Sequence, residues 1–229
     1  MHKVLFTNCP LTEEEIVCLR KEAIEIIPAG KDLKDNELLE LLKECEIVIV
    51  NGNEYYSEEI LCQCPHLKVI QYYGIGYTAC VNLEVALKYG KMVFNTPKVN
   101  SYSVAEFSLG LLLALNQKIL LNNENTRKGI WQEQSFFDLK DRTIGILGMG
   151  HIGTYFAEIM YHAFHTKILF YDILEKEDIQ IKYQAEKVSL ERIFKESDIV
   201  SVHLPLTSET KSLIGKKELD SMKSSAYLI

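Results

Sequence analysis

The sequence lacks any block of basic residues and carries an excess of acids. Its 229 residues include 25 Lys and Arg against 32 Asp and Glu, for a formal net charge of −7. The basic residues are scattered among acidic ones. Proteins that bind DNA or RNA neutralise phosphates with clustered Lys and Arg. The sequence therefore predicts that nucleic acid is not a partner.

A long apolar run is also missing. Crossing a bilayer takes about 20 consecutive apolar residues. The most apolar segment, 109–115, is far shorter and has polar residues on both sides. The first residues enter a strand-like pattern at once, without the apolar stretch of a secretory signal. These absences predict a cytoplasmic protein with no membrane partner.

Cysteine occurs six times, but not in the pattern of a metal site. Cys62, Cys64 and Cys80 come nearest to one, yet no His or second Cys pair lies at zinc-like spacing. In a chain without a secretory leader, cysteines are typically reduced thiols rather than a disulfide framework. We therefore expect no metal and no disulfide.

Short apolar runs alternate with helical patterns along the whole chain, with no short repeat and no low-complexity tract. Strands are expected over 3–7, 46–50, 67–72, 92–95, 143–147, 167–171, 199–203 and 226–229. Helices are expected over 12–23, 35–45, 57–62, 83–89, 101–128, 151–163, 188–194 and 216–222. Alternation of this kind is typical of an α/β fold, in which helices cover the faces of a parallel sheet.

A break at 95–97 divides this alternation into two series, and it contains the proline Pro97. The long helix that follows has Ser101 or Ser103 as its expected N-cap and ends near Gly129. Its apolar positions suit burial against another domain or subunit. We expect one domain over residues 1–98 and a second over residues 99–229.

The second series contains a dinucleotide-binding fingerprint, with glycines at 148, 150 and 153. An apolar strand runs directly into it and a helix leaves from it, which is the context that this motif requires. Gly148 would permit the tight turn, Gly150 would let the backbone approach a pyrophosphate, and Gly153 would allow close packing of helix on strand. The start of the helix offers free N–H groups to the phosphates.

Asp172 ends the second strand of this unit, nineteen residues after Gly153. A carboxylate at that place can accept hydrogen bonds from the adenosine ribose. No arginine follows it in 173–176, so a 2′-phosphate would meet negative charge. The pattern favours NAD over NADP, and over S-adenosylmethionine, which uses a similar layout.

Other segments resemble the D-isomer-specific 2-hydroxyacid dehydrogenase family, and the resemblance spans essentially the whole chain. The matching segments are 73–76, 95–97, 104–106, 127–131, 137–139, 143–148 and 198–207 with Thr210. The resemblance implies a flavodoxin-like N-terminal substrate domain and a Rossmann-type doubly wound NAD-binding domain. It also implies hydride transfer between a nicotinamide cofactor and a small 2-keto or 2-hydroxy acid.

The resemblance assigns roles to particular residues. Those that would contact NAD are Val104, Gly148, Gly150, His151, Ile152, Gly153, Asp172, Leu204, Pro205 and Thr210. Among them, His151 and Ile152 would flank the pyrophosphate, and Val104 would lie near the nicotinamide. Backbone N–H groups of Ile75 and Gly76 would bind the substrate carboxylate, which needs the close approach that glycine permits. The resemblance is also compatible with a homodimer.

Several residues invite alternatives or depart from the family pattern. His203 could be a catalytic base, but we expect a structural role for it, and we expect Trp131 to pack at the domain junction. The segment 78–82 is one residue longer than usual, which affects the substrate loop. Asp141 stands at a turn position where glycine is usual.

In the family, the segment resembling 222–229 is followed by a catalytic arginine, then an acidic residue and a histidine. No catalytic residue is therefore expected within this sequence, and all three are expected after Ile229, with the second sheet incomplete. We accordingly expect the 229-residue chain alone to bind NAD weakly and to be inactive as a dehydrogenase. A non-catalytic NAD-binding sensor or interaction module is the alternative.

Overall fold

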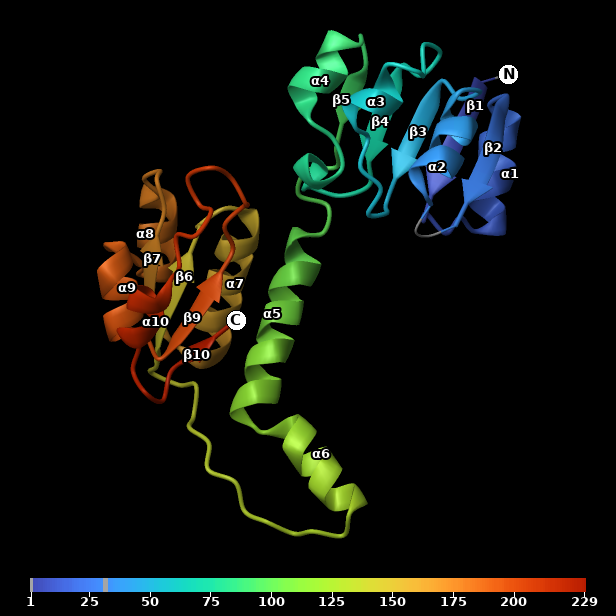
Figure 1. The fold of residues 1–229 in the computed structure, drawn as a ribbon. Helices are drawn as coiled ribbons and strands as arrows, with labels where there is room; N and C mark the ends of the chain where they lie inside the picture. Colours follow the sequence, from blue (N-terminus) through green and yellow to red (C-terminus); the bar gives the residue numbers. More distant parts are fainter. Residues whose placement is uncertain (1, 31–32) are drawn as a thin grey trace. The chain divides into compact units, whose positions relative to one another are not determined.

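The computed structural model describes residues 2–30 and 33–229, and the chain forms two compact units, Met1–Val99 and Asn100–Ile229. Each unit is built on a parallel sheet with helices on its faces (Figure 1). The fold is therefore α/β, as the alternation of apolar runs and helical patterns predicts.

The first unit has a five-stranded sheet in the order β2-β1-β3-β4-β5. Its strands are β1 (His2–Thr7), β2 (Ile24–Ala29), β3 (Ile47–Val50), β4 (Val69–Tyr72) and β5 (Met92–Phe94). Its helices are α1 (Glu13–Lys21), α2 (Asp35–Leu42), α3 (Glu58–Leu61) and α4 (Leu83–Lys88), with a 3₁₀ turn at Tyr77–Ala79. This strand order is that of flavodoxin.

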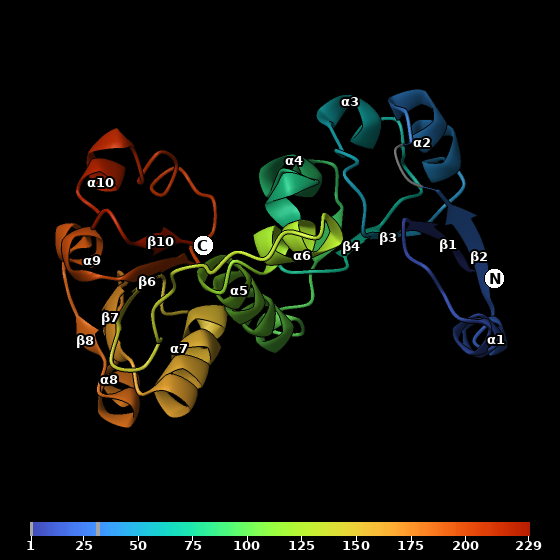
Figure 2. The ribbon, with the colours of Figure 1, turned by 90° about the horizontal axis from the view of Figure 1, so that it is seen from below.

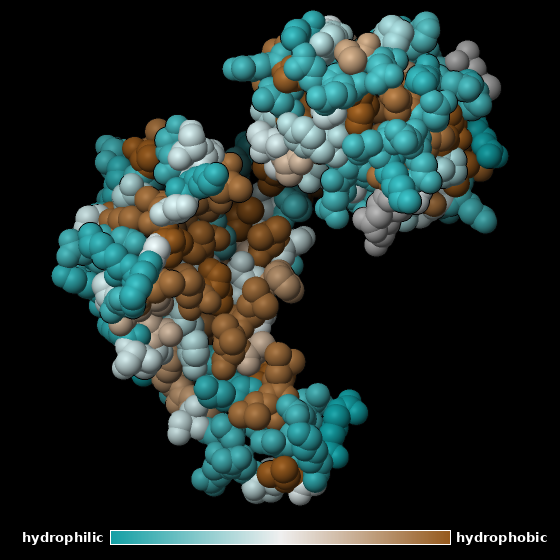
Figure 3. Space-filling model, in the orientation of Figure 1, coloured by the Kyte–Doolittle hydropathy of each residue, from teal (hydrophilic) through white to brown (hydrophobic). Residues whose placement is uncertain are grey.

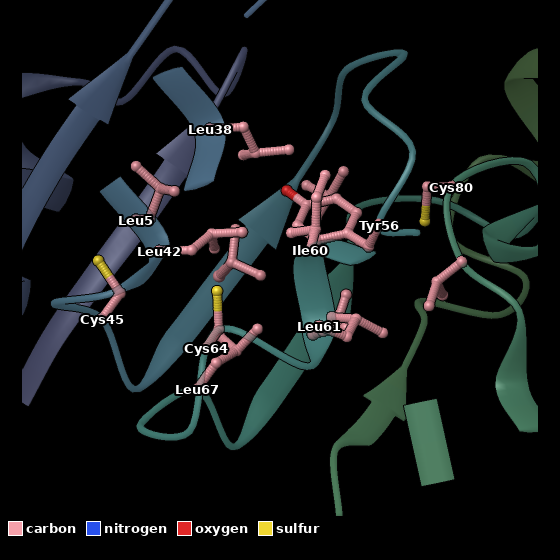
Figure 4. Close-up of a cluster of buried hydrophobic side chains, with 14 of the residues drawn as sticks. Leu5, Leu38, Leu42, Cys45, Tyr56, Ile60, Leu61, Cys64, Leu67 and Cys80 are labelled. Carbon is pink, nitrogen blue, oxygen red and sulfur yellow. The ribbon is translucent and has the colours of Figure 1, made fainter. Parts of the chain in front are cut away.

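Helices cover both faces of the first sheet, with α1 on one side and α2 and α3 on the other (Figure 2). Between the sheet and the second group of helices lies an apolar cluster that includes Leu5, Leu42, Tyr56 and Leu61, each buried (Figure 4). Cys45, Cys64 and Cys80 are buried in the same cluster as free thiols.

The second unit has a five-stranded parallel sheet in the order β10-β9-β6-β7-β8. Its strands are β6 (Thr143–Leu147), β7 (Lys167–Tyr171), β8 (Glu186–Lys187), β9 (Ile199–Val202) and β10 (Tyr227–Leu228). Its helices are α5 (Ser101–Asn116), α6 (Ile119–Arg127), α7 (His151–Phe164), α8 (Glu177–Tyr183), α9 (Leu190–Glu196) and α10 (Lys216–Asp220). The first strand lies in the middle, as in a Rossmann fold.

Side chains of the central strands alternate between two cores, because successive residues of a strand point to opposite faces. Ile144 and Ile146 face the core that also contains residues of α5 and α7. Leu147 and Leu169 face the core on the α9 side. This two-sided burial explains why these strands are continuous apolar runs in the sequence.

The expectation of one helix over 101–128 is wrong. The helix breaks between α5 and α6, where Lys118 has a φ of +53°, and the two parts are bent by 55°. The N-cap position is Asn100, not Ser101 or Ser103, and its side chain makes no capping hydrogen bond. Within the described residues no single helix could cross a membrane, and only the bent pair α5 and α6 meets the length and hydropathy test.

Three elements have no counterpart among the expected ones: β2, α8 and β8. β2 pairs with β1 along its whole length but is only half-buried, and its sequence contains Pro28. A proline is tolerated on an edge strand, but it hides the strand from pattern reading. β8 has two residues, too few for any alternation to show.

Candidate functional site

The glycine turn lies at the carboxyl end of β6, where the strand order of the second sheet reverses. Ligands of open α/β sheets bind at this switch point. The turn is tied to both neighbouring strands, because Gly148 N–H donates to Tyr171 O at 2.8 Å and His203 N–H donates to Leu147 O at 2.8 Å. The sheet therefore holds the turn in place from both sides.

Each of the three glycines meets a different physical requirement. Gly148 has a φ of +90°, and a Cβ there would lie 2.8 Å from the carbonyl oxygen of His203. A Cβ on Gly153 would lie 2.1 Å from Gly148 O, so α7 can pack this close to the turn only without a side chain. A Cβ on Gly150 would meet nothing within 4 Å. Space for a ligand is thus left open at Gly150.

Helix α7 begins at this open position and points its N-terminus toward it. Among the described residues, the N–H groups of Gly150, His151 and Ile152 donate to no protein acceptor. No acidic residue lies in the first turn of this fourteen-residue helix. Free N–H groups and the positive end of the helix dipole together form an anion site, and the pyrophosphate of a dinucleotide fits these donors.

Asp172 follows β7 and faces the same turn. Its Oδ2 accepts a hydrogen bond from Met149 N–H at 2.7 Å, and its Oδ1 accepts one from Leu174 N–H at 2.8 Å. The carboxylate is thereby fixed beside the glycine turn, where it can accept further hydrogen bonds from a diol. The hydrogen bond from Met149 N–H to Asp172 could not be predicted from the sequence, because every residue except proline has the same backbone N–H group.

The residues after β9 complete this side of the turn. The Leu204 side chain would lie 3.0 Å from a Cβ on Gly148. Thr210 Oγ1 donates to Pro205 O at 2.5 Å and accepts from Thr207 N–H at 2.8 Å, which shapes the loop. Leu204 therefore borders the turn directly, and Pro205 and Thr210 belong to the loop that continues from it.

Val104 lies in the first turn of α5, which packs against α7. The Tyr102 and Tyr155 rings meet edge to face, with centroids 5.4 Å apart, so the starts of these two helices lie side by side. Val104 is half-buried. The structure thus brings Val104 to the end of unit two that holds the glycine turn.

His203 packs inside this region rather than facing open space. Its Nε2 lies 2.8 Å from Ser201 Oγ, and its ring centroid is 5.5 Å from that of Phe156. Burial lowers the pKa of His203 from 6.5 to about 4. A neutral, packed imidazole agrees with the structural role expected for it.

The predicted carboxylate-binding residues lie in unit one, after β4. Ile75 O accepts from Asn95 Nδ2 at 2.9 Å, and Gly74 O accepts from Thr96 N–H at 2.9 Å. Within the described part of the chain, the N–H groups of Ile75 and Gly76 have no acceptor. A Cβ on Gly76 would meet nothing within 4 Å. Two adjacent free donors on an anchored loop can bind a carboxylate.

Two residues noted in the sequence behave in informative ways. Trp131 is 95% exposed within its own unit, and its packing at the domain junction stays a prediction. Asp141 has a φ of +60°, which explains why a glycine suits this turn. The longer segment after Tyr77 forms the 3₁₀ turn and leads to Cys80, whose carbonyl accepts from Tyr56 N–H at 2.7 Å.

A strand, a glycine turn and a helix N-terminus at the switch point define a dinucleotide-binding α/β unit. Residues 109–229 match the family model "D-isomer specific 2-hydroxyacid dehydrogenase, NAD binding domain". The chain belongs to this family, and its second unit is of the NAD-binding type.

Individual relatives agree with this membership. A glyoxylate reductase of Thermococcus litoralis is 35% identical over 201 residues, which cover 84% of this chain and 60% of that protein. One of Thermococcus gammatolerans is 31% identical, covering 100% of this chain and 71% of that protein. The D-lactate dehydrogenase of Aquifex aeolicus, solved with NAD and lactic acid, is 29% identical with a TM-score of 0.81, covering 98% of this chain and 67% of that one. The chain spans about 60% of the length of the first of these relatives.

Proposed function

We propose that this chain is the NAD-binding and substrate-carboxylate-binding part of an oxidoreductase that interconverts a small 2-keto acid and a D-2-hydroxy acid. The observation that carries the proposal is the open glycine turn at Gly150, with free N–H groups on one side and the fixed Asp172 carboxylate on the other. Family membership supports the reaction type.

In this proposal, unit two positions the cofactor. The α7 N–H groups bind the pyrophosphate, Asp172 accepts hydrogen bonds from the adenosine ribose, and Leu204, Pro205 and Thr210 border the nucleotide. Val104 lies on the nicotinamide side. NAD, when bound, supplies the hydride acceptor or donor. The residues of this chain bind and orient it.

Unit one would hold the other reactant. The free N–H groups of Ile75 and Gly76 would donate to the carboxylate of the acid, as charge-assisted hydrogen bonds. Asn95 and Thr96 hold this loop by bonding to the carbonyls of Ile75 and Gly74. These two contacts keep the free N–H groups in place for a carboxylate.

We further propose that the chain forms a homodimer through α5 and α6. Figure 3 shows apolar side chains gathered over the surface along α5. Large exposed apolar residues on these helices include Phe107, Leu111, Leu115, Ile119 and Leu120. A surface of this kind is typical of a protein interface. Size-exclusion chromatography with light scattering should show a dimer that Leu120→Glu converts to a monomer, whereas a monomeric wild type would contradict the proposal.

The main test is titration of the wild type and Asp172→Ala with NAD and with NADP. The wild type should prefer NAD, because a 2′-phosphate would meet the Asp172 carboxylate. Asp172→Ala should weaken NAD binding about tenfold, which corresponds to the loss of one hydrogen bond to a charged group. It should also reduce the ratio of the affinity for NAD to the affinity for NADP. If both affinities fell by the same factor, Asp172 would serve the turn alone and the ribose contact would be wrong.

A further inference from the structure

A cavity of about 570 Å³ lies at the carboxyl end of the unit-one sheet. The strand order of this sheet reverses beside β1, and open α/β sheets bind ligands in the crevice at such a switch point. None of the lining residues is among those assigned to NAD or to the substrate carboxylate. They come from the loops after β1, β2 and β3, and are Asn8, Cys9, Pro10, Ala29, Gly30 and Asn51.

Two asparagines fasten the loops around this crevice to one another. Asn8 Nδ2 donates to Asn51 O at 2.7 Å, and Asn51 Nδ2 donates to Asn8 O at 3.2 Å. Asn8 N–H also donates to Ala29 O at 3.2 Å, and Asn51 N–H donates to Thr7 O at 3.1 Å. Both asparagines are half-buried, and Asn8 has a φ of +51°, a conformation that asparagine tolerates better than most residues. Hydrogen bonds within the protein therefore hold the crevice in shape.

The same two carboxamides keep hydrogen-bonding groups free for a ligand. A carboxamide has two N–H donors and an oxygen that can accept two hydrogen bonds. Asn8 and Asn51 each use one N–H group, and within the described residues neither Oδ1 accepts a hydrogen bond. A hydroxyl group can donate to such an oxygen and accept from such an N–H group. The crevice therefore suits a ligand that carries hydroxyl groups.

The charge around the crevice indicates that this part of the ligand is neutral. Among the described residues, no charged side chain lines the cavity. The helix that follows its first loop, α1, has Glu13, Glu14 and Glu15 in its first turn, so its N-terminus does not attract an anion as that of α7 does. A charged group that entered the crevice would lose its hydration without gaining an opposite charge. A neutral hydroxylated group pays no such penalty.

The crevice adjoins the loop that is proposed to bind the substrate carboxylate. Tyr73 N–H donates to Val50 O at 2.7 Å, so the start of that loop is bonded to the residue before Asn51. Neighbouring strands of a sheet lie about 4.8 Å apart, so roughly 7 Å separates the end of β4 from the gap between β3 and β1. A two- or three-carbon acid does not span this distance, whereas the tail of a six-carbon acid does.

We propose that the crevice binds the hydroxylated tail of the acid substrate, with Asn8 and Asn51 as its hydrogen-bonding partners. The inference rests on the proposed function, because the carboxylate of the same molecule is bound by the N–H groups of Ile75 and Gly76. It narrows the substrate to 2-keto and 2-hydroxy acids with an uncharged, hydroxylated tail. Lactate, with three carbons, would leave the crevice to water.

The experiment is a titration of the 229-residue protein with three D-2-hydroxy acids, followed by amide NMR: D-gluconate, D-2-hydroxyhexanoate and D-lactate. All three carry the same carboxylate and 2-hydroxyl group, and only D-gluconate has a hydroxylated tail. D-Gluconate should bind about tenfold more tightly than D-2-hydroxyhexanoate, which corresponds to one or two neutral hydrogen bonds. It alone should shift the side-chain amides of Asn8 and Asn51, whereas all three acids should shift the backbone amides of Ile75 and Gly76.

The outcomes distinguish a failure of this inference from a failure of the proposed function. If all three acids shift Ile75 and Gly76 with equal affinity, the crevice does not bind the tail and the inference alone is wrong. Tighter binding of D-gluconate without shifts at Asn8 and Asn51 would place the tail elsewhere and would also overturn it. If no acid shifts Ile75 and Gly76, the proposed carboxylate site is wrong and the inference fails with it.

Variants of the two asparagines test the partners directly. Asn51→Leu keeps a side chain of similar size without its hydrogen-bonding groups, and it should abolish the preference for D-gluconate over D-2-hydroxyhexanoate. Asn8→Gly keeps the positive φ and tests the other carboxamide, should Asn51→Leu fail to fold. Gln132→Leu, the same kind of change at an exposed position of unit two, should leave all three affinities unchanged. An undiminished preference for D-gluconate in the asparagine variants would overturn the proposal.

Discussion

The two sheets of this protein are built alike, but within residues 2–30 and 33–229 a glycine turn with an acid-free helix start follows the first strand of the second sheet and not that of the first. In both, the strand order reverses beside the first strand of the unit, which creates a switch point. After β6 the chain turns through Gly148 and opens at Gly150. After β1 it turns through Asn8, which has a φ of +51°, and reaches α1 with three glutamates in its first turn.

The difference lies in what happens to the helix N-terminus. In α1, Thr12 Oγ1 accepts from Glu15 N–H at 3.3 Å and Glu15 Oε2 accepts from Thr12 N–H at 2.8 Å. This capping box occupies two donors, Thr12 N–H and Glu15 N–H, and the three glutamates add negative charge. In α7 the corresponding donors stay free and no acid is present. Strand order thus creates a place for a ligand, and the first helical turn decides whether an anion can occupy it.

The largest predicted effect comes from filling the tightest contact of unit two. Gly153→Ala would place a Cβ 2.1 Å from Gly148 O, so α7 must move away from the turn. We expect a loss of about 3 kcal/mol in unfolding free energy, the upper range for overpacking, measured by urea denaturation. Hydrogen exchange should show the loss in β6, β7 and β9 and not in the strands of unit one.

Gly150→Ala is the matched control for that variant. Its Cβ would meet nothing within 4 Å, and alanine at an N-cap costs about 1 kcal/mol or less relative to glycine. Unit two should remain folded while NAD binding weakens, because the methyl group occupies the space left for the pyrophosphate. Equal destabilisation by the two alanines would contradict the roles assigned to these glycines.

Acid should weaken unit two through His203, which has no counterpart in the unit-one site. Burial lowers the pKa of His203 from 6.5 to about 4. Between pH 6.5 and pH 4, His203 is therefore protonated in the unfolded chain and neutral in the folded chain. The contribution of the neutral His203 to the unfolding free energy is complete above pH 6.5. As the pH falls to 4, the unfolding free energy decreases by up to about 3 kcal/mol. Hydrogen exchange across this range should show it in β9 and β6.

His203→Gln tests the assignment, since the glutamine amide can still reach Ser201 but does not titrate in this range. Relative to the wild type, the variant should lose less stability between pH 6.5 and pH 4. Other groups that titrate in this range are present in both proteins and cancel in the difference. Parallel pH profiles of the two proteins would show that His203 does not control the acid response.

The sequence was sufficient for the parts of the fold and site that repeat a pattern. The buried strands β6 and β7 are continuous apolar runs, and the fingerprint glycines stand in their expected context, so both were predictable. The break at Lys118 was not, because nothing in a lysine indicates a left-handed turn. The contact between Met149 N–H and Asp172 was equally invisible, since a backbone donor looks the same at every position.

Converting α7 into a helix like α1 would sharpen the comparison. His151→Glu adds an acid to the first turn beside the free N–H groups. It should leave the unfolding free energy of unit two unchanged or slightly higher, because an acid is favourable at this end of a helix. It should also weaken NAD about tenfold, through repulsion of the pyrophosphate. His151→Gln, with no charge, is the control, and calorimetric titration in low salt measures both.

The smallest effect is expected in unit one, where a capping box holds the start of α1. Thr12→Ala removes the acceptor for Glu15 N–H, so α1 loses half of its capping box. The substitution should lower the unfolding free energy of unit one by about 1 kcal/mol. Glu15→Gln keeps an acceptor for Thr12 N–H and should cost less. Urea denaturation, monitored by hydrogen exchange of the α1 amides, measures both losses. Because α1 belongs to unit one and is no part of the proposed NAD site, neither change should alter NAD affinity. A loss of NAD binding in Thr12→Ala would mean that the α1 end also contributes to the nucleotide site, and the contrast between the two sheets would fail.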